Sequence, residues 1–285
     1  MRVADPSRAS YLSRKLGAKL RRMREQAGHT LDTAAVELDK TRSALHRVET
    51  GETKADVHLV RTMMDLYDCY DEDLLEETRK AAKPPWFRAF GVKGSGKILG
   101  VETAATEASE YSVQVIPGLL QTESYMRALF MARRNRRTDP EVSVRIRLAR
   151  QHRLSAEDNP LRCVAVIDEV ALLRPVGGPD VMREQLEHLL VMAALPTVIL
   201  RVLPLACGAH HVMPGPFLLF GFPDPEDPGY VYIEHLNGGL HSDDIEDVKN
   251  ARLALEEVQS SALGPTDSIA LIERLLEAPP WTFRC

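Results

Sequence analysis

Two adjacent prolines, Pro84-Pro85, separate stretches of the chain whose apolar residues follow different periods. Before them, apolar residues recur at helical spacing in five short segments. Every run with the composition of a β-strand comes after them. Because proline lacks the backbone N–H that a helix interior or a central strand needs, neither element passes through this point. The sequence therefore predicts two domains, residues 1–83 and residues 86–285.

The stretch before the prolines carries a start or stop signal at the boundaries of its five expected helices. Glycine readily adopts the left-handed backbone of a helix C-terminus, and it follows the first helix at Gly28 and the third at Gly51. Small alanines on the second helix, and a tight turn at Asp39-Lys40 before the third, are typical of a helix-turn-helix. The side-chain oxygens that can cap the second to fifth helices belong to Thr30, Thr41, Asp56 and Asp71.

The segment LRRMREQAGHTLDTAAVELDKTRSALHRVETGE resembles the Cro/repressor (XRE) family of DNA-binding domains, and the resemblance covers about residues 12–80. Its ending, SALHRVETG, is the most specific part. In that family an arginine near the end of the first helix pairs with a glutamate near the end of the third. The resemblance places this pair at Arg24 and Glu49 and implies a structural ion pair that fixes the first helix on the third.

The solvent-facing start of the third helix is where the resemblance places contacts with DNA. Arginine can read the O6 and N7 atoms of guanine, and hydroxyl groups can bond phosphate or bases. The family often has Gln at the start of the second helix, where this chain has Leu31, so no DNA contact is carried over to that position. A helix-turn-helix used only for protein contacts is the alternative. The expected DNA-binding residues are Thr41, Arg42, Ser43, His46 and Arg47.

The stretch after the prolines mixes helical and strand-like segments. Strand-like composition marks residues 109–116, 162–168, 197–204, 216–222 and 229–235. Helical patterns mark residues 99–108, 141–155, 179–194, 244–262 and 267–277. We therefore expect an α+β domain around one mostly antiparallel sheet, with one crossover helix, after the all-α five-helix domain.

Several segments of this second stretch resemble the uncharacterised C-terminal domain of WhiJ-like regulators of actinomycetes. Among them are VIPGLLQTESYMRALF, DEVALLRPVGGPDVMREQLEHLL and VLPLACGAHHVMPGPFLLF, in the family's order, and the resemblance covers roughly residues 86–277. In that family the domain follows an XRE-type helix-turn-helix. Its members are taken as transcriptional regulators and are often encoded beside small partner proteins. The resemblance implies this architecture and role but supplies no ligand-binding residue.

Residues 91–98, GVKGSGKI, and residues 163–169, CVAVIDE, imitate the two motifs of a nucleotide hydrolase. A working phosphate-binding loop follows a strand, opens a helix and has Ser or Thr after its lysine to bind magnesium. Ile98 stands in that last position, and the PPWFRAF stretch before the loop is no buried strand. We interpret the two patterns as coincidence. No Ser/His/Asp or Cys/His set stands in a recognisable order either, so we expect no catalytic residue, no enzymatic activity and no cofactor.

Two further groups of residues invite a functional interpretation. Cys207, His210 and His211 are close in sequence, but adjacent histidines rarely reach one ion and no second ligand pair at zinc spacing follows, so we expect a loop and no metal site. Residues 127–153 contain nine arginines against two acidic residues. This stretch either binds phosphate or an acidic partner, or it is a solvated helix face, and the sequence leaves both open.

Charge is segregated along the chain. The whole sequence has a net charge of −5, but residues 1–54 carry +5 and residues 155–285 carry −12. A basic block on an acidic protein indicates a local polyanion site near the N-terminal helices. No apolar run approaches the roughly 18 residues of a membrane span, no signal-peptide pattern opens the chain, and the four cysteines lie far apart. These features predict a cytoplasmic protein with no membrane segment.

Two functions fit these expectations. The first is a transcriptional regulator that binds double-stranded DNA at an inverted-repeat operator as a homodimer, and whose C-terminal domain senses a small-molecule effector or a partner. The second is an antitoxin-like interaction protein that sequesters a small partner protein and binds DNA to regulate its own operon.

Overall fold

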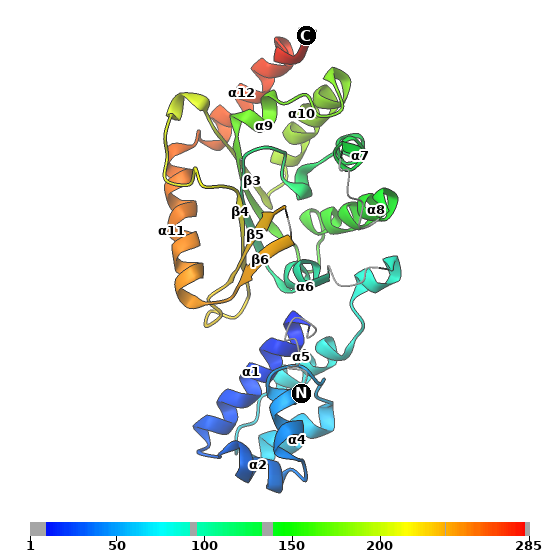
Figure 1. Cartoon of the computed structure of the whole chain (residues 1–285), viewed down its shortest axis with the longest axis vertical. Helices are drawn as coiled ribbons and strands as arrows, with labels where there is room; N and C mark the ends of the chain where they lie inside the picture. Colours follow the sequence, from blue (N-terminus) through cyan, green and yellow to red (C-terminus); the bar gives the residue numbers. More distant parts are fainter. Residues whose placement is uncertain (1–9, 92–95, 133–138, 237, 283–285) are drawn as a thin grey trace. The chain divides into compact units, whose positions relative to one another are not determined.

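The computed structural model describes residues 10–91, 96–132, 139–236 and 238–282 (Figure 1). The chain divides into two compact units, Met1–Ala104 and Ala105–Cys285. The first is helical in its described residues, and the second combines helices with a six-stranded sheet.

The helices of the first unit begin where capping side chains are available. Thr30, Thr41, Asp56 and Asp71 each accept a backbone N–H of the helix that follows, as the sequence predicts. Ser10 does the same for the first helix. The elements are α1 (Tyr11–Gln26), α2 (Leu31–Glu37), α3 (Arg42–Glu49), α4 (Val57–Leu66), α5 (Glu72–Ala82), a 3-10 helix (Trp86–Phe90) and α6 (Gly96–Ala104).

The helix count corrects the five-helix expectation, because α6 belongs to this unit and packs on α1. The sequence predicts a helix starting at residue 99 but gives no sign of this packing. The reason is that α6 has hardly any amphipathic character and contains two glycines, so its apolar residues define no clear face.

One apolar core joins α1 to α5, and its most buried members include Leu20, Leu45 and Met63. At Gly17, a Cβ atom would lie 2.5 Å from the carbonyl oxygen of Glu49. At Gly51, where φ is +73°, a Cβ would lie 2.6 Å from the backbone nitrogen of Arg14. Backbone therefore lies directly on backbone where α1 crosses the end of α3, which fixes the orientation of α3 in the unit.

The second unit contains one mixed sheet with the strand order β3-β2-β1-β4-β5-β6. β1, β2 and β3 are parallel to one another, whereas β4, β5 and β6 are added antiparallel. The expected mostly antiparallel sheet is therefore wrong. The strands are β1 (Glu107–Ser112), β2 (Arg162–Asp168), β3 (Val198–Leu203), β4 (Phe217–Gly221), β5 (Tyr230–His235) and β6 (Gly238–Ser242).

Two long helical connections produce the parallel half. The chain passes from β1 to β2 through α7 (Glu123–Ala132) and α8 (Pro140–Gln151), and from β2 to β3 through α9 (Glu169–Leu173) and α10 (Pro179–Ala193). Connections of this length carry the chain back to the end of the sheet where the previous strand began, so consecutive strands run the same way. The sequence predicts the second crossover helix. It also predicts a helix at 141–155, which corresponds to α8, but not that this helix belongs to a crossover.

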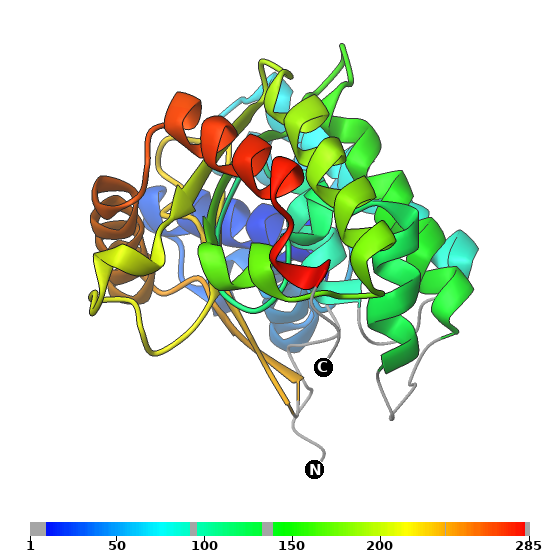
Figure 2. The ribbon, with the colours of Figure 1, turned by 90° about the horizontal axis from the view of Figure 1, so that it is seen from above.

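Helices cover both faces of the sheet. α11 (Ile245–Ser261) lies along one face, and α7, α8 and α10 lie on the other, as the two views show (Figures 1 and 2). α12 (Pro265–Glu277) runs beside the edge strand β3. There the Val202 N–H donates to the Ser268 hydroxyl at 2.9 Å, and the Leu263 N–H donates to the Val202 carbonyl at 2.9 Å. This end of the sheet is thus closed by side-chain and loop hydrogen bonds.

Candidate nucleic-acid interface

The turn between α2 and α3 is tight and is held by backbone hydrogen bonds. Asp39 adopts a left-handed conformation with φ of 52°, and the Lys40 N–H donates to the Ala35 carbonyl at 2.8 Å. On α2, Ala34 and Ala35 are buried, and their small side chains allow α3 to approach closely. This is the geometry of a helix-turn-helix, with α3 in the place of the recognition helix.

The five side chains expected to contact DNA are exposed together at the start and along the outer side of α3. Leu45 and Val48 occupy the inner side of the same helix and are buried. Thr41 uses its hydroxyl oxygen to accept the Ala44 N–H at 3.2 Å, so its hydroxyl hydrogen can still be donated to a phosphate. The exposed set is Thr41, Arg42, Ser43, His46 and Arg47.

Arg42 has a partner that the sequence does not predict. Its Nε lies 3.1 Å from Oδ1 of Asp32 in the first turn of α2, and both side chains are about two-thirds exposed or more, at 67% and 72%. An exposed pair of this kind contributes at most about 1 kcal/mol, so it can open when a base or a phosphate competes for the guanidinium. No spacing rule links residues across a turn, so only the folded structure reveals the pair.

The position of α3 depends on a buried ion pair with α1. Arg24 donates from Nε to Glu49 Oε1 at 2.7 Å and from Nη2 to Glu49 Oε2 at 3.0 Å, and its Nη1 donates to the His29 carbonyl at 2.8 Å. The two side chains are 8% and 3% exposed. The hydrogen bond to Glu49 raises the pKa of Arg24 although burial opposes this shift. The pair is therefore inaccessible to DNA and suited to holding the two helices together.

Several cations of α1 are occupied inside the unit. Lys19 pairs with Glu77 at 2.7 Å, and Arg21 pairs with Glu25 at 2.7 Å. The positive charge that the sequence places near the N-terminal helices is therefore partly structural. On the exposed face of α3 it resides in Arg42 and Arg47.

Two family models match the chain. Residues 15–78 match a model described as a helix-turn-helix domain, which spans α1 to α5. Residues 96–274, more than half of the chain, match a model described as a domain of unknown function, DUF5753. The chain belongs to the DUF5753 family. No curated protein and no solved structure matches it.

The match assigns α6 to the DUF5753 region, although α6 packs on α1 in the first unit.

Among the described helices, none has both the length and the apolar character to cross a membrane.

The nucleotide-hydrolase pattern falls partly on residues 92–95, which lie outside the described residues. The described segment before it, Trp86–Phe90, is a 3-10 helix, whereas a phosphate-binding loop follows a strand. In the DUF5753 domain, CVAVIDE is β2 followed by the start of α9. Asp168 accepts the Val170 N–H at 2.9 Å and the Tyr111 hydroxyl at 3.3 Å. One carboxylate oxygen of Asp168 thus caps α9, and the other accepts a hydrogen bond from the neighbouring strand β1.

The Cys207–His211 loop of the DUF5753 domain spreads its side chains. His210 Nε2 lies 3.3 Å from the Tyr111 hydroxyl, whereas His211 Nδ1 lies 3.8 Å from Oε2 of Glu257. Burial and the neighbouring Asp168 raise the pKa of Tyr111. Throughout the described ranges, no group of three or more His, Cys, Asp or Glu residues is placed to hold a metal ion.

The arginine-rich stretch is described in part, because residues 133–138 lie outside the described residues. Arg127 pairs with Glu123 and Glu141, and Arg153 donates to the Ala105 carbonyl at 2.8 Å. Arg147 hydrogen-bonds Gln121 and lies over the Phe130 ring at 4.7 Å. These three arginines therefore have structural partners within the DUF5753 region.

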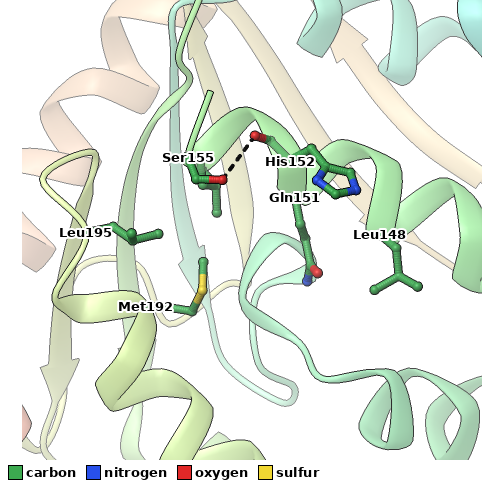
Figure 3. Close-up of a pocket in the computed structure, with 7 residues that line it drawn as sticks. Leu148, Gln151, His152, Ser155, Met192 and Leu195 are labelled. Atoms are coloured by element: carbon green, nitrogen blue, oxygen red, sulfur yellow. Dashed lines mark hydrogen bonds between the residues drawn. The ribbon is translucent and has the colours of Figure 1, made fainter. Parts of the chain in front are cut away.

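A shallow cavity of about 330 Å³ lies between the end of α8 and the end of α10 (Figure 3). Met192 and Leu195 line one side, and Leu148, Gln151 and His152 line the other (Figure 3). The Gln151 amide donates to the Gln121 carbonyl at 2.7 Å, and the Ser155 hydroxyl donates to the His152 carbonyl. The lining is mostly apolar, and these polar groups already bond the protein.

Proposed function

We propose that this protein is a cytoplasmic transcriptional regulator that binds double-stranded DNA in a sequence-specific manner through α3. The observation that carries the proposal is the common exposure of the α3 side chains on a helix whose other side is buried. The resemblance of the N-terminal helices to the XRE family, and of the rest to WhiJ-like regulators, supports it. Arg42 and Arg47 are the expected readers of guanine, whereas Thr41 and Ser43 are expected to contact phosphate.

We also propose that the protein acts as a homodimer on an inverted repeat. A helix-turn-helix monomer reads one half-site, and a two-fold dimer places two recognition helices about 34 Å apart in successive major grooves. The sheet supports this proposal, since its β3 edge is closed by α12 whereas β6 stands at its other end. Around β6, Leu236 and Leu240 are 99% and 52% exposed. An edge strand with exposed apolar side chains beside it is suited to pairing with the same strand of a second copy.

The DUF5753 domain is the proposed receiver of the signal that controls DNA binding. The domain order, in which a large α/β unit is joined to a small helix-turn-helix, supports this proposal. A small molecule or a partner protein could supply the signal.

The test is DNA binding by purified full-length protein. Genomic fragments that bind would first be sequenced to find the site, and gel shifts at fixed salt would then compare variants. Arg42→Ala is expected to weaken binding by about 1–3 kcal/mol and to relax specificity at one base position. Arg79→Ala is the matched control, because Arg79 is also exposed and paired with a carboxylate but lies on α5. Equal binding by wild type and Arg42→Ala would contradict the assignment of α3.

A further inference from the structure

A second cavity, of about 380 Å³, lies between α11 and the sheet at the amino ends of β1, β2 and β3. Its floor is one row of side chains across four strands. Val164 is the register partner of Ile199 and of Ser109, and Ser109 is the partner of Leu219. Leu255 of α11 lines the opposite wall. The floor thus carries three apolar side chains and one hydroxyl group, which donates to Glu107 Oε1 at 2.9 Å, whereas most of the remaining lining is charged or polar. The volume is in the lower part of the range for small-molecule sites.

Three arginines from three different elements line this cavity: Arg162 of β2, Arg201 of β3 and Arg252 of α11. Arg162 has a carboxylate partner, since its Nη1 lies 3.4 Å from Glu107 Oε2. Arg252 is exposed and donates to the Pro228 carbonyl at 3.2 Å. Arg201, the third arginine, has different surroundings from these two.

Arg201 is half-buried, and its described hydrogen bond is a long one, 3.4 Å from Nη1 to the Gln259 carbonyl. In the described part of the chain, no carboxylate lies within ion-pair distance of it. Its register partner on β2 is Val166, and its neighbours on the same face of β3 are Ile199 and Leu203. An apolar side chain would suit this position better, because a half-buried cation without a counter-ion loses hydration without full compensation. Such local costs are expected at functional sites.

We propose that this cavity binds a small amphiphilic acid, with the anionic head on the Arg201 guanidinium and the apolar body on the floor of the cavity. The planar guanidinium presents paired N–H groups that match the oxygens of a carboxylate, sulfonate or phosphate. Glu107 and Glu256 also line the cavity, so three cations face two carboxylates and the site suits a single negative charge. This inference rests on the proposed role of the DUF5753 domain as the receiver of a signal and names the chemistry of that signal.

The experiment is a fluorescence titration of the full-length protein with two probes of matched shape. The anionic probe is anilinonaphthalene sulfonate, and the neutral one is phenylnaphthylamine, which lacks the sulfonate. Wild type is expected to bind the anionic probe with saturation at one molecule per chain. Arg201→Met should weaken that binding about tenfold or more, because it removes a charge-assisted hydrogen bond, and should leave the neutral probe within about twofold. Arg183→Met, which changes an exposed arginine of α10, should alter neither.

Thermal unfolding without a probe distinguishes a ligand-binding arginine from a structural one. Arg201→Met is expected to melt at or above the temperature of wild type, whereas loss of a structural arginine would lower it. If the methionine variant does not fold, the inference is wrong, and so it is if the variant binds the anionic probe like wild type. Ile199→Trp, which fills the apolar floor, should exclude both probes. The titrations contain no DNA. The expected probe binding can therefore be absent while DNA binding through α3 is observed, and DNA binding can be absent while probe binding is observed.

Discussion

At the residue scale, the Arg24–Glu49 pair makes a sharp prediction about stability. Glu49→Gln removes the main counter-ion of a buried guanidinium and leaves only the longer contact of Arg24 with Glu25, at 3.4 Å, so we expect it to lower the free energy of unfolding by about 3–5 kcal/mol. The double variant Arg24→Met, Glu49→Leu should lose less than Glu49→Gln alone, because no charge stays buried. Urea unfolding followed by Trp86 fluorescence, in a Trp281→Phe background, measures both. Glu77→Gln breaks the more exposed pair with Lys19 and should cost at most about 1 kcal/mol.

His188 on α10 makes a prediction about pH. Its Nε2 is buried without a hydrogen-bond partner among the described residues, and burial lowers its pKa below the usual 6.5, with Glu184 opposing the shift. As pH falls through about 6.5, the unfolded chain takes up a proton that the folded chain refuses, so stability falls.

We therefore expect the free energy of unfolding of the second unit to decrease from about pH 7.5 to about pH 5.5. His188→Leu should flatten this dependence. Urea unfolding at several pH values, followed by Trp281 in a Trp86→Phe background, gives the slope. An unchanged slope in the variant would assign the pH dependence to other groups.

The sequence predicts residues well where their role depends on near neighbours in the chain. The capping oxygens of Thr30 and Thr41 act within three residues of themselves, and the structure confirms them. The Arg42–Asp32 pair and the setting of Arg201 could not be predicted in this way. The first depends on the angle between two helices, and the second depends on which strands lie beside β3 and in which register.

At the scale of elements, two glycines of the first unit should respond to alanine in opposite directions. Gly17 lies on α1 against the backbone of α3, with no room for a Cβ, so Gly17→Ala should cost about 1–3 kcal/mol through overpacking. Gly100 lies on α6, and no atom of another element lies within 4 Å of the place a Cβ would take, so Gly100→Ala should stabilise by up to about 1 kcal/mol. Unfolding followed by Trp86 compares the two. If both substitutions stabilise, α1 and α3 are less tightly apposed than the structure shows.

In the sheet, the ends of a strand depend on nearby residues in the chain, whereas the pairing of strands does not. Four of the five expected strands agree with the structure within one residue at each end, because each apolar run is bounded by turn residues. Pairing is not local. The chain between β1 and β2 contains two helices, α7 and α8, which is the length of a parallel crossover, but no residue pattern within β1 or β2 shows that the two strands pair. The sequence does not predict β6, because Gly238–Ser242 is short and lacks an alternating pattern.

At the scale of the whole molecule, three boundaries compete: the prolines at 84–85, the start of the DUF5753 match at residue 96, and the division of the structure after Ala104. They differ in where they place α6. Since α6 packs on α1 but is joined directly to β1, it belongs to the first unit by packing and to the DUF5753 domain by family. The prolines end the helix-turn-helix proper, whose five helices share one core.

Fragments of the chain decide between these boundaries. We expect residues 1–83 to fold and to bind DNA weakly, because a monomer contacts one half-site. Residues 1–104 should be more stable, since they retain α6 on α1, yet bind DNA no more tightly. Residues 86–285 should self-associate through the edge strand β6 and should not bind DNA. Light scattering measures association, and a salt titration measures DNA binding by each fragment. A monomeric 86–285 fragment that binds duplex DNA with a steep salt dependence would instead assign phosphate binding to the arginine-rich stretch and contradict this division of labour.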